Sequence, residues 1–119
     1  MITKEFSHHF AQHWIDAWNS HKMDQILSHY TDDFEMSSPY IVTLMNEASG
    51  TLKGKEKISD YWTIALTRFP DLEFRLREVF HSTDSIILYY HSVHRGTDSA
   101  EYFLFNEDGK VVKSAGHYQ

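Results

Sequence analysis

Apolar residues recur at every third or fourth position in three segments of the chain, which is the spacing of an amphipathic helix. The first segment, residues 4–20, carries its apolar stripe at Phe6, Phe10, Trp14, Ala17 and Trp18. A second stripe covers residues 23–30. A third opens at Gly54 and runs to Phe69, where Pro70 ends it because proline cannot continue a helix. We therefore predict three helices.

From residue 72 onward apolar and polar residues alternate, as in a strand with one buried face. The alternation slips at residues 78–80, which indicates a β-bulge. Turn-forming residues then separate three further predicted strands, at residues 86–94, 99–105 and 110–118. A short strand is expected at residues 34–38. Residues 40–53 show no clean period and are predicted as a long loop, with room for a short strand at residues 40–44.

This order of elements favours an α+β fold. Three N-terminal helices would cover one face of a cone-shaped, curved antiparallel sheet formed largely by the second half of the chain. The chain has 119 residues, which is the usual size of one domain, and we find no repeat or linker in it. We therefore expect residues 1–119 to form a single domain.

The first C-terminal hairpin predicts a register for two of the strands. A two-residue loop at residues 96–97 would place Ser92 opposite Glu101 and Tyr90 opposite Phe103. Side chains on the same face then alternate with those on the other face along each strand.

The second hairpin predicts the register of the last strand. A loop at residues 108–109 would place Phe105 opposite Val112 and Glu101 opposite Gly116. Both loops assign the same inner face: Leu88, Tyr90, Ser92, His94, Glu101, Phe103, Phe105, Ser114, Gly116 and Tyr118.

The outer face of this sheet is too apolar to meet water alone. We assign to it Ile87, Tyr89, His91, Val93, Tyr102, Leu104, Val111, Lys113 and His117. Helices cover only one side of the sheet, so a second copy of the chain is the natural cover for the other. We predict a homodimer through this outer face.

Composition narrows the range of partners. The formal net charge is −6 and no basic run occurs, which argues against nucleic acid or an anionic membrane. The first residues lack the apolar core of a signal peptide and no apolar run approaches 18 residues, so we expect a cytoplasmic protein. The chain has no cysteine, which excludes thiolate metal sites, and no nucleotide-binding motif, so we expect no cofactor. The aromatic share of 15% suits a cavity for an apolar small molecule.

Glu101 is the first candidate catalytic residue. The aromatic neighbours on its face would desolvate the carboxyl group and raise its pKa, as suits a general acid or a hydrogen-bond donor to a carbonyl. His94 is the second candidate, because it can pair with Glu101 across the hairpin and serve as a base or orient the acid. His91 is not its partner in a metal site, since the two histidines point to opposite faces.

The candidate ligand contacts are aromatic or hydroxyl-bearing side chains of the inner face and of the elements expected to cover it. They are Trp14, Tyr30, Ser38, Tyr90, Phe103, Ser114 and Tyr118. His9 and His13 share a helical face, but no carboxylate motif accompanies them, so we predict no metal site.

Three stretches of the chain resemble the nuclear transport factor 2-like superfamily, in its SnoaL-like branch. They are HWIDAWNSHKMDQILSHYTDDFEMSSP, GTLKGKEKISDYW and EYFLFNEDGKVVKSAGHY. The resemblance implies a cone with a deep apolar pocket and a dimer through the outer sheet face. The superfamily includes ketosteroid isomerases, polyketide cyclases, dehydratases, epoxide hydrolases and non-catalytic binders, so the fold alone names no reaction.

Of the three catalytic positions in the ketosteroid isomerase pattern, only one carries the expected residue type in this sequence. The resemblance would place the proton-shuttling carboxylate at Ser38, the oxyanion-site tyrosine at Trp14 and the second oxyanion acid at Glu101. Serine cannot replace a carboxylate base, so we do not expect that isomerase activity.

The prediction from sequence is therefore a small-molecule-binding domain, with any chemistry being cofactor-free acid–base catalysis of the cyclase, isomerase or dehydratase type. Two alternatives stay open at this point. One is a non-catalytic ligand-binding domain on the same pocket, and the other is a protein-interaction module whose aromatic residues are only core.

Overall fold

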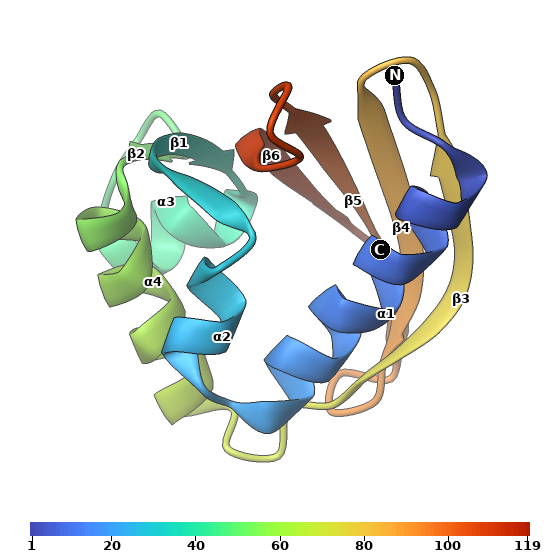
Figure 1. Cartoon of the computed structure of the whole chain (residues 1–119). Coiled ribbons are helices and arrows are strands. Elements are labelled where there is room, and N and C mark those ends of the chain that lie inside the picture. The colour runs from blue at the N-terminus through green and yellow to red at the C-terminus, as the bar shows by residue number, and fades with distance from the viewer.

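The computed structural model of the chain describes all residues from 1 to 119 and shows four helices and six strands (Figure 1). The helices are α1 (Lys4–Ser20), α2 (Met23–Leu27), α3 (Pro39–Met45) and α4 (Lys55–Arg68). The strands are β1 (Tyr30–Ser37), β2 (Thr51–Lys53), β3 (Phe74–His81), β4 (Ser85–Ser92), β5 (Thr97–Phe105) and β6 (Val111–Tyr118). The predicted α+β class with a curved sheet is confirmed.

The six strands form one sheet in the order β2-β1-β6-β5-β4-β3. Four neighbouring pairs are antiparallel, and β1 runs parallel to β6. A parallel pair needs a long crossover rather than a hairpin, and here the whole chain from α3 to β5 separates the two strands. The pairing of β1 with β6 therefore joins the N-terminal and C-terminal thirds of the chain.

The helices lie against the concave side of this sheet (Figure 1). Helix α1 packs along β3, and α4 packs against β1, β2, α2 and α3. Thr3 caps the start of α1, where its hydroxyl accepts from the amide of Phe6, and His21 ends the helix in the left-handed conformation. The apolar stripe predicted for α1 is buried, with Trp14 only 2% exposed.

The second helix is shorter than predicted. It ends at Leu27, and Tyr30 begins β1 beside Val111 of β6. A tyrosine at position 30 fits both a helical stripe and a strand whose buried residues are Tyr30, Phe34 and Met36. Pairing with β6 decides between the two, because tertiary contacts override local spacing.

The prediction of a loop and a possible short strand at the start of residues 40–53 is wrong. Helix α3 occupies Pro39–Met45, and β2 lies near the end of the segment. Ser38 caps α3 by accepting from the amide of Tyr40, and Pro39 takes the first helical position, where its missing N–H is harmless. The pair Ser-Pro was therefore a helix start rather than a strand end.

The predicted bulge is confirmed, since the β3–β4 register shifts between Leu76 and Glu78. The register predicted for β4 and β5 is wrong by four residues. Ser92 lies opposite Thr97 and Leu88 lies opposite Glu101, because residues 93–96 form a four-residue turn. The amides of residues 95 and 96 both donate to the carbonyl of Ser92 in that turn.

The register predicted for β5 and β6 holds over most of the pair. Glu101 lies opposite Gly116, as predicted. The register then shifts by one residue after Leu104, so that Phe105 lies opposite Val111 instead of Val112. Because of this irregularity the Val111 side chain points into the core, where it is fully buried. Its predicted place on the outer face is therefore wrong. No helix of the chain is long and apolar enough to cross a membrane.

Candidate functional site

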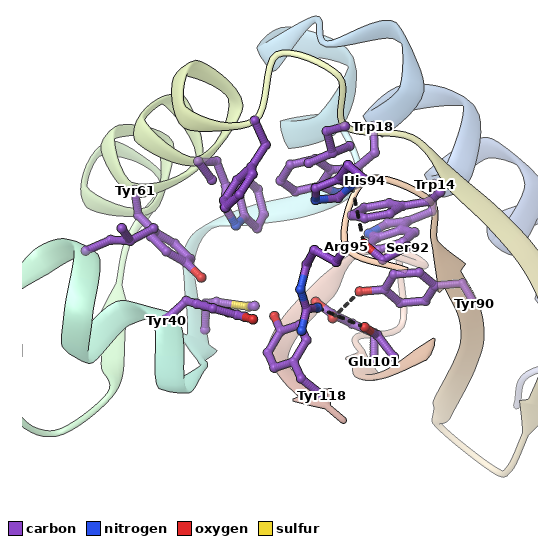
Figure 2. Close-up of a pocket in the computed structure, with 18 residues that line it drawn as sticks. Trp14, Trp18, Tyr40, Tyr61, Tyr90, Ser92, His94, Arg95, Glu101 and Tyr118 are labelled. Atoms are coloured by element: carbon purple, nitrogen blue, oxygen red, sulfur yellow. Dashed lines mark hydrogen bonds between the residues drawn. The ribbon is translucent and has the colours of Figure 1, made fainter. Parts of the chain in front are cut away.

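A cavity of about 80 Å³ lies between the inner face of the sheet and the helices (Figure 2). Most of its lining is aromatic or aliphatic, contributed by α1, α3, α4 and the strands. The remaining lining residues all come from one hairpin, β4–β5: Ser92, His94, Arg95, Ser99 and Glu101. The charged and imidazole side chains of the cavity therefore all come from this hairpin.

Glu101 is the buried acid of the cavity. Its side chain is on the inner face of β5, and the residue is only 4% exposed. The Tyr90 hydroxyl donates to Glu101 Oε1 at 3.3 Å, as the dashed line in Figure 2 marks. Burial raises the pKa of Glu101 to about 8, and the single hydrogen bond from Tyr90 offsets this only in part. The carboxyl group is therefore neutral at pH 7 and can donate a hydrogen bond.

Gly116 makes room for an aromatic ring beside this acid. It lies opposite Glu101 on β6, and a Cβ atom there would come within 2.9 Å of Cζ of Tyr118. The Tyr118 ring therefore folds over the glycine. Burial raises the pKa of the Tyr118 hydroxyl, and the nearby Glu101 raises it further.

A chain of hydroxyl groups links the cavity wall to the start of α3. The Tyr61 hydroxyl donates to Ser38 Oγ at 3.3 Å, and Ser38 Oγ donates to the Tyr118 hydroxyl at 3.4 Å. Burial is the main cause that raises the pKa of Tyr61 to about 12. Ser38 thus holds two cavity tyrosines in place and also caps α3.

Trp14 and Tyr30 form a second buried pair. Trp14 Nε1 donates to the Tyr30 hydroxyl at 2.9 Å, and both residues are 2% exposed. The Trp14 ring stacks on Phe74 of β3 with centroids 5.7 Å apart. Trp14 lines the cavity, whereas Tyr30 does not. The Tyr30 hydroxyl accepts the hydrogen bond of the Trp14 indole N–H.

His94 lies at the partly exposed end of the cavity, which we call the mouth and define by Phe69, His94 and Arg95. It has left the strand for the turn, where its Nδ1 lies 3.3 Å from Ser92 Oγ and its ring lies 5.2 Å from that of Phe69. No hydrogen bond joins it to Glu101, because the register differs from the predicted one. Partial burial is the largest cause that lowers the pKa of His94.

Arg95 is a cavity residue that sequence reasoning missed. Its guanidinium carbon lies 5.2 Å from the centre of the Tyr40 ring and 5.1 Å from that of Tyr118, so the side chain reaches in among these rings (Figure 2). Its Nη1 donates to Ser99 Oγ at 3.5 Å. A turn residue follows no alternation, so no pattern in the sequence signals where its side chain points.

The structure brings five of the nine sequence-predicted site residues onto the cavity surface, namely Trp14, Tyr90, His94, Glu101 and Tyr118. The other four pack behind the wall: Tyr30, Ser38, Phe103 and Ser114. Besides Arg95, the aromatic residues not predicted as contacts are Trp18, Tyr40, Tyr61, Trp62, Phe69 and Phe74. The sequence signal that could have identified most of them is their position on the apolar stripes of the predicted helices and strands.

The model of the SnoaL-like domain matches residues 11–114. A SnoaL-like protein of unknown function from Burkholderia thailandensis is 46% identical, with 99% of this chain and 98% of that chain covered and a TM-score of 0.94. An NTF2-like protein of unknown function from Cytophaga hutchinsonii is 13% identical, covering 100% of this chain and 92% of that one, at a TM-score of 0.70.

A third similar structure is TerC co-crystallised with polyporic acid, 15% identical over 96% of this chain and 92% of that one, with a TM-score of 0.76. Among curated proteins, no sequence matches the chain. The two distant structures show the fold alone. The match over residues 11–114 and the 46% identical relative show more: the chain belongs to the SnoaL-like family of the NTF2-like fold.

Proposed function

We propose that the chain binds a small, largely apolar molecule in the cavity and that Glu101 acts on it as a neutral acid. The observation that carries the proposal is a carboxyl group that is 4% exposed on an aromatic-lined cavity, with a pKa of about 8. Desolvating an acid is unfavourable, and acids with raised pKa values in concave sites are concentrated at functional centres. The similar structure of TerC with polyporic acid supports the idea that this fold holds small organic molecules.

The chemistry that fits a neutral carboxyl group is donation to a carbonyl oxygen. The Glu101 O–H would donate to that oxygen and stabilise the negative charge that develops when a proton leaves the adjacent carbon. His94 is the candidate acceptor of that proton, because its lowered pKa keeps the imidazole neutral at pH 7. When the Glu101 proton passes to the oxygen as His94 takes the carbon proton, the product is an enol, and Glu101 is left as a carboxylate and His94 as an imidazolium. Such a step suits a cofactor-free isomerase, dehydratase or cyclase.

A non-catalytic binding domain is the second candidate. It is favoured by the absence of a hydrogen bond between Glu101 and His94. The side-chain hydrogen-bond partner of Glu101 is Tyr90, and that of His94 is Ser92. In that case Glu101 selects ligands that accept a hydrogen bond and no proton is transferred. A cytoplasmic location stays a prediction.

The test begins with the molecule that the protein retains on purification. Native mass spectrometry identifies the bound compound, and its turnover and affinity are then measured for wild type, Glu101→Gln and Glu78→Gln. Glu78 is an exposed glutamate of β3 and serves as the matched control. For an acid catalyst we expect Glu101→Gln to lower turnover by about 100-fold or more with little loss of affinity.

Two results would count against parts of this proposal. Unchanged turnover in Glu101→Gln would remove the catalytic role and leave the binding domain. A protein that retains no compound and binds none of a chemically varied panel would remove the ligand-binding function.

We also propose the homodimer predicted from sequence. The outer sheet face carries Phe80 and Ile87 with exposed fractions of 57% and 44%, and these two residues pair across β3 and β4. Val93, in the turn that follows β4, is 37% exposed. Two copies of such a face can cover each other. Sedimentation should give twice the chain mass for wild type and the mass of one chain for Ile87→Lys. A wild-type protein that stays at one chain mass at high concentration would contradict the dimer.

A further inference from the structure

Arg95 is a half-buried cation without an acidic partner. The structure contains four ion pairs, and none of them includes Arg95. An arginine keeps its charge at every physiological pH, and removing that charge from water without a counter-ion is unfavourable. In this protein the unpaired charge sits at the mouth of the one cavity that is also lined by a buried acid.

The way Arg95 is held leaves its hydrogen-bonding edge available. The rings of Tyr40 and Tyr118 contact the guanidinium as cation–π partners, at 5.2 and 5.1 Å. The N–H groups lie in the plane of the guanidinium, and the structure uses one of them, in a long 3.5 Å bond to Ser99. A fork of donors held by aromatic rings is suited to a carboxylate, which accepts two parallel hydrogen bonds.

A second cavity residue has a donor without an acceptor. Trp18 lines the cavity, is 6% exposed, and its Nε1 has no hydrogen-bond partner. Buried indole N–H groups normally find an acceptor. The unused N–H groups of Arg95 and the unpaired Nε1 of Trp18 therefore belong to residues of the same cavity, which indicates a ligand that carries acceptor oxygens.

Resting on the function proposed above, we propose that the ligand is a small aromatic carboxylic acid whose carboxylate pairs with Arg95 and whose ring lies against the tryptophans of the cavity. A carboxylate fits better than a phosphate, because a doubly charged group would meet one cation in an otherwise apolar lining. The protein as a whole is negative, with a formal net charge of −6, so this local positive charge marks the mouth as the entry for an anion.

The size of the cavity assigns Arg95 a second role. Its volume of about 80 Å³ is smaller than the roughly 150 Å³ of an apolar cavity that holds benzene. A ring therefore enters only when the guanidinium moves from between Tyr40 and Tyr118. Arg95 lies on a four-residue turn and forms no ion pair, so this movement breaks only its two cation–π contacts and the long bond to Ser99. On ligand binding the guanidinium of Arg95 moves away from Tyr40 and Tyr118 and pairs with the ligand carboxylate.

The experiment compares matched acids and amides. Benzoate, phenylacetate and cinnamate are titrated at pH 7 against their neutral amides, with the fluorescence of Trp14, Trp18 and Trp62 as the readout, since all three line the cavity. The variants are Arg95→Gln, Arg95→Lys and, as a control, Arg75→Gln. Arg75 is an exposed arginine that pairs with Glu73 outside the cavity.

We expect wild type and Arg75→Gln to bind the best acid about tenfold more tightly than its amide. Arg95→Gln should bind the acid and the amide equally, and Arg95→Lys should be intermediate because it keeps the charge but loses the fork. Equal binding of acid and amide by wild type, or a preference that survives in Arg95→Gln, would overturn the carboxylate proposal while leaving the pocket function intact. Failure of wild type to bind any of these acids or amides would overturn the carboxylate proposal, and the function proposed above falls with it only if the protein also retains no compound and binds none of the varied panel.

Discussion

Two carboxyl groups three residues apart on β5 face opposite sides of the sheet and have opposite properties. Asp98, on the outer face, accepts from the Arg77 guanidinium at 2.9 Å and the Tyr89 hydroxyl at 2.8 Å, and lies 2.7 Å from His91 Nδ1. These partners lower its pKa to about 2. Glu101, on the inner face, has one hydrogen bond and a pKa of about 8.

The difference shows how partners decide the state of a carboxyl group. Asp98 is surrounded by donors and cations, so its charged form is favoured, as expected for a structural ion pair. Glu101 is surrounded by aromatic rings and one hydroxyl group, so the effect of desolvation exceeds that of the hydrogen bond and the neutral form is favoured. The strand presents both acids because alternate residues point to opposite faces, and only the inner one meets a cavity.

The largest predicted effect is a difference in stability loss when one side chain on each face of the sheet is shortened to alanine. Phe103 is fully buried and its ring lies 4.9 Å from that of Phe10, so Phe103→Ala should destabilise the protein by about 4 kcal/mol. Its outward-facing neighbour Leu104 is half-buried, and Leu104→Ala should cost about 1 kcal/mol. Urea unfolding of both variants at one protein concentration checks this, and equal losses would mean that the two faces are equally packed.

The second effect concerns the pH dependence of stability. The pKa of Glu101 is raised from 4.5 to about 8 in the folded protein, so its contribution to the free energy of unfolding is full below pH 4.5 and falls as the pH rises to 8. Wild type should lose roughly 3 kcal/mol from this group between pH 4.5 and 7. Glu101→Gln should lack this loss. A variant whose stability follows the wild-type pH profile would mean that the acid is not desolvated.

The third effect has the opposite sign and is smaller. The pKa of Asp98 is lowered from 3.8 to about 2, so its contribution is present above pH 3.8 and is lost as the pH falls through 2. Asp98→Asn should therefore be less stable than wild type at neutral pH, and the difference should vanish near pH 2. The loss is modest because the site lies at the solvent-facing surface. Thermal unfolding across this range checks it, and a constant difference at every pH would contradict the ionic origin.

The placement of Glu101 inside and His91 outside could be predicted although the hairpin register was wrong. The predicted β4–β5 pairing was shifted by four residues, and any even shift keeps each side chain on its face. What the shift changed is the neighbour of the acid. Leu88 rather than Ser92 lies opposite Glu101, and His94 moves from the strand to the turn, away from the acid.

The parts that escaped prediction depend on contacts distant in sequence. The parallel pairing of β1 with β6 has no local signal, because the two strands lie at opposite ends of the chain. The position of Arg95 depends on Tyr40 from α3 and Tyr118 from β6, neither of which adjoins it in sequence. Helix α3 is different, since the Ser38-Pro39 pair was a local signal that we interpreted as a strand end.

The most direct test of a neutral Glu101 at pH 7 is its titration. Carbon-13 NMR of the side-chain carboxyl groups, assigned with Glu101→Gln and Asp98→Asn, measures the titrations of both acids in one sample. We expect the Glu101 signal to titrate near pH 8 and the Asp98 signal near pH 2. A Glu101 signal that titrates near 4.5, the ordinary value for a glutamate, would mean that the acid is charged at pH 7.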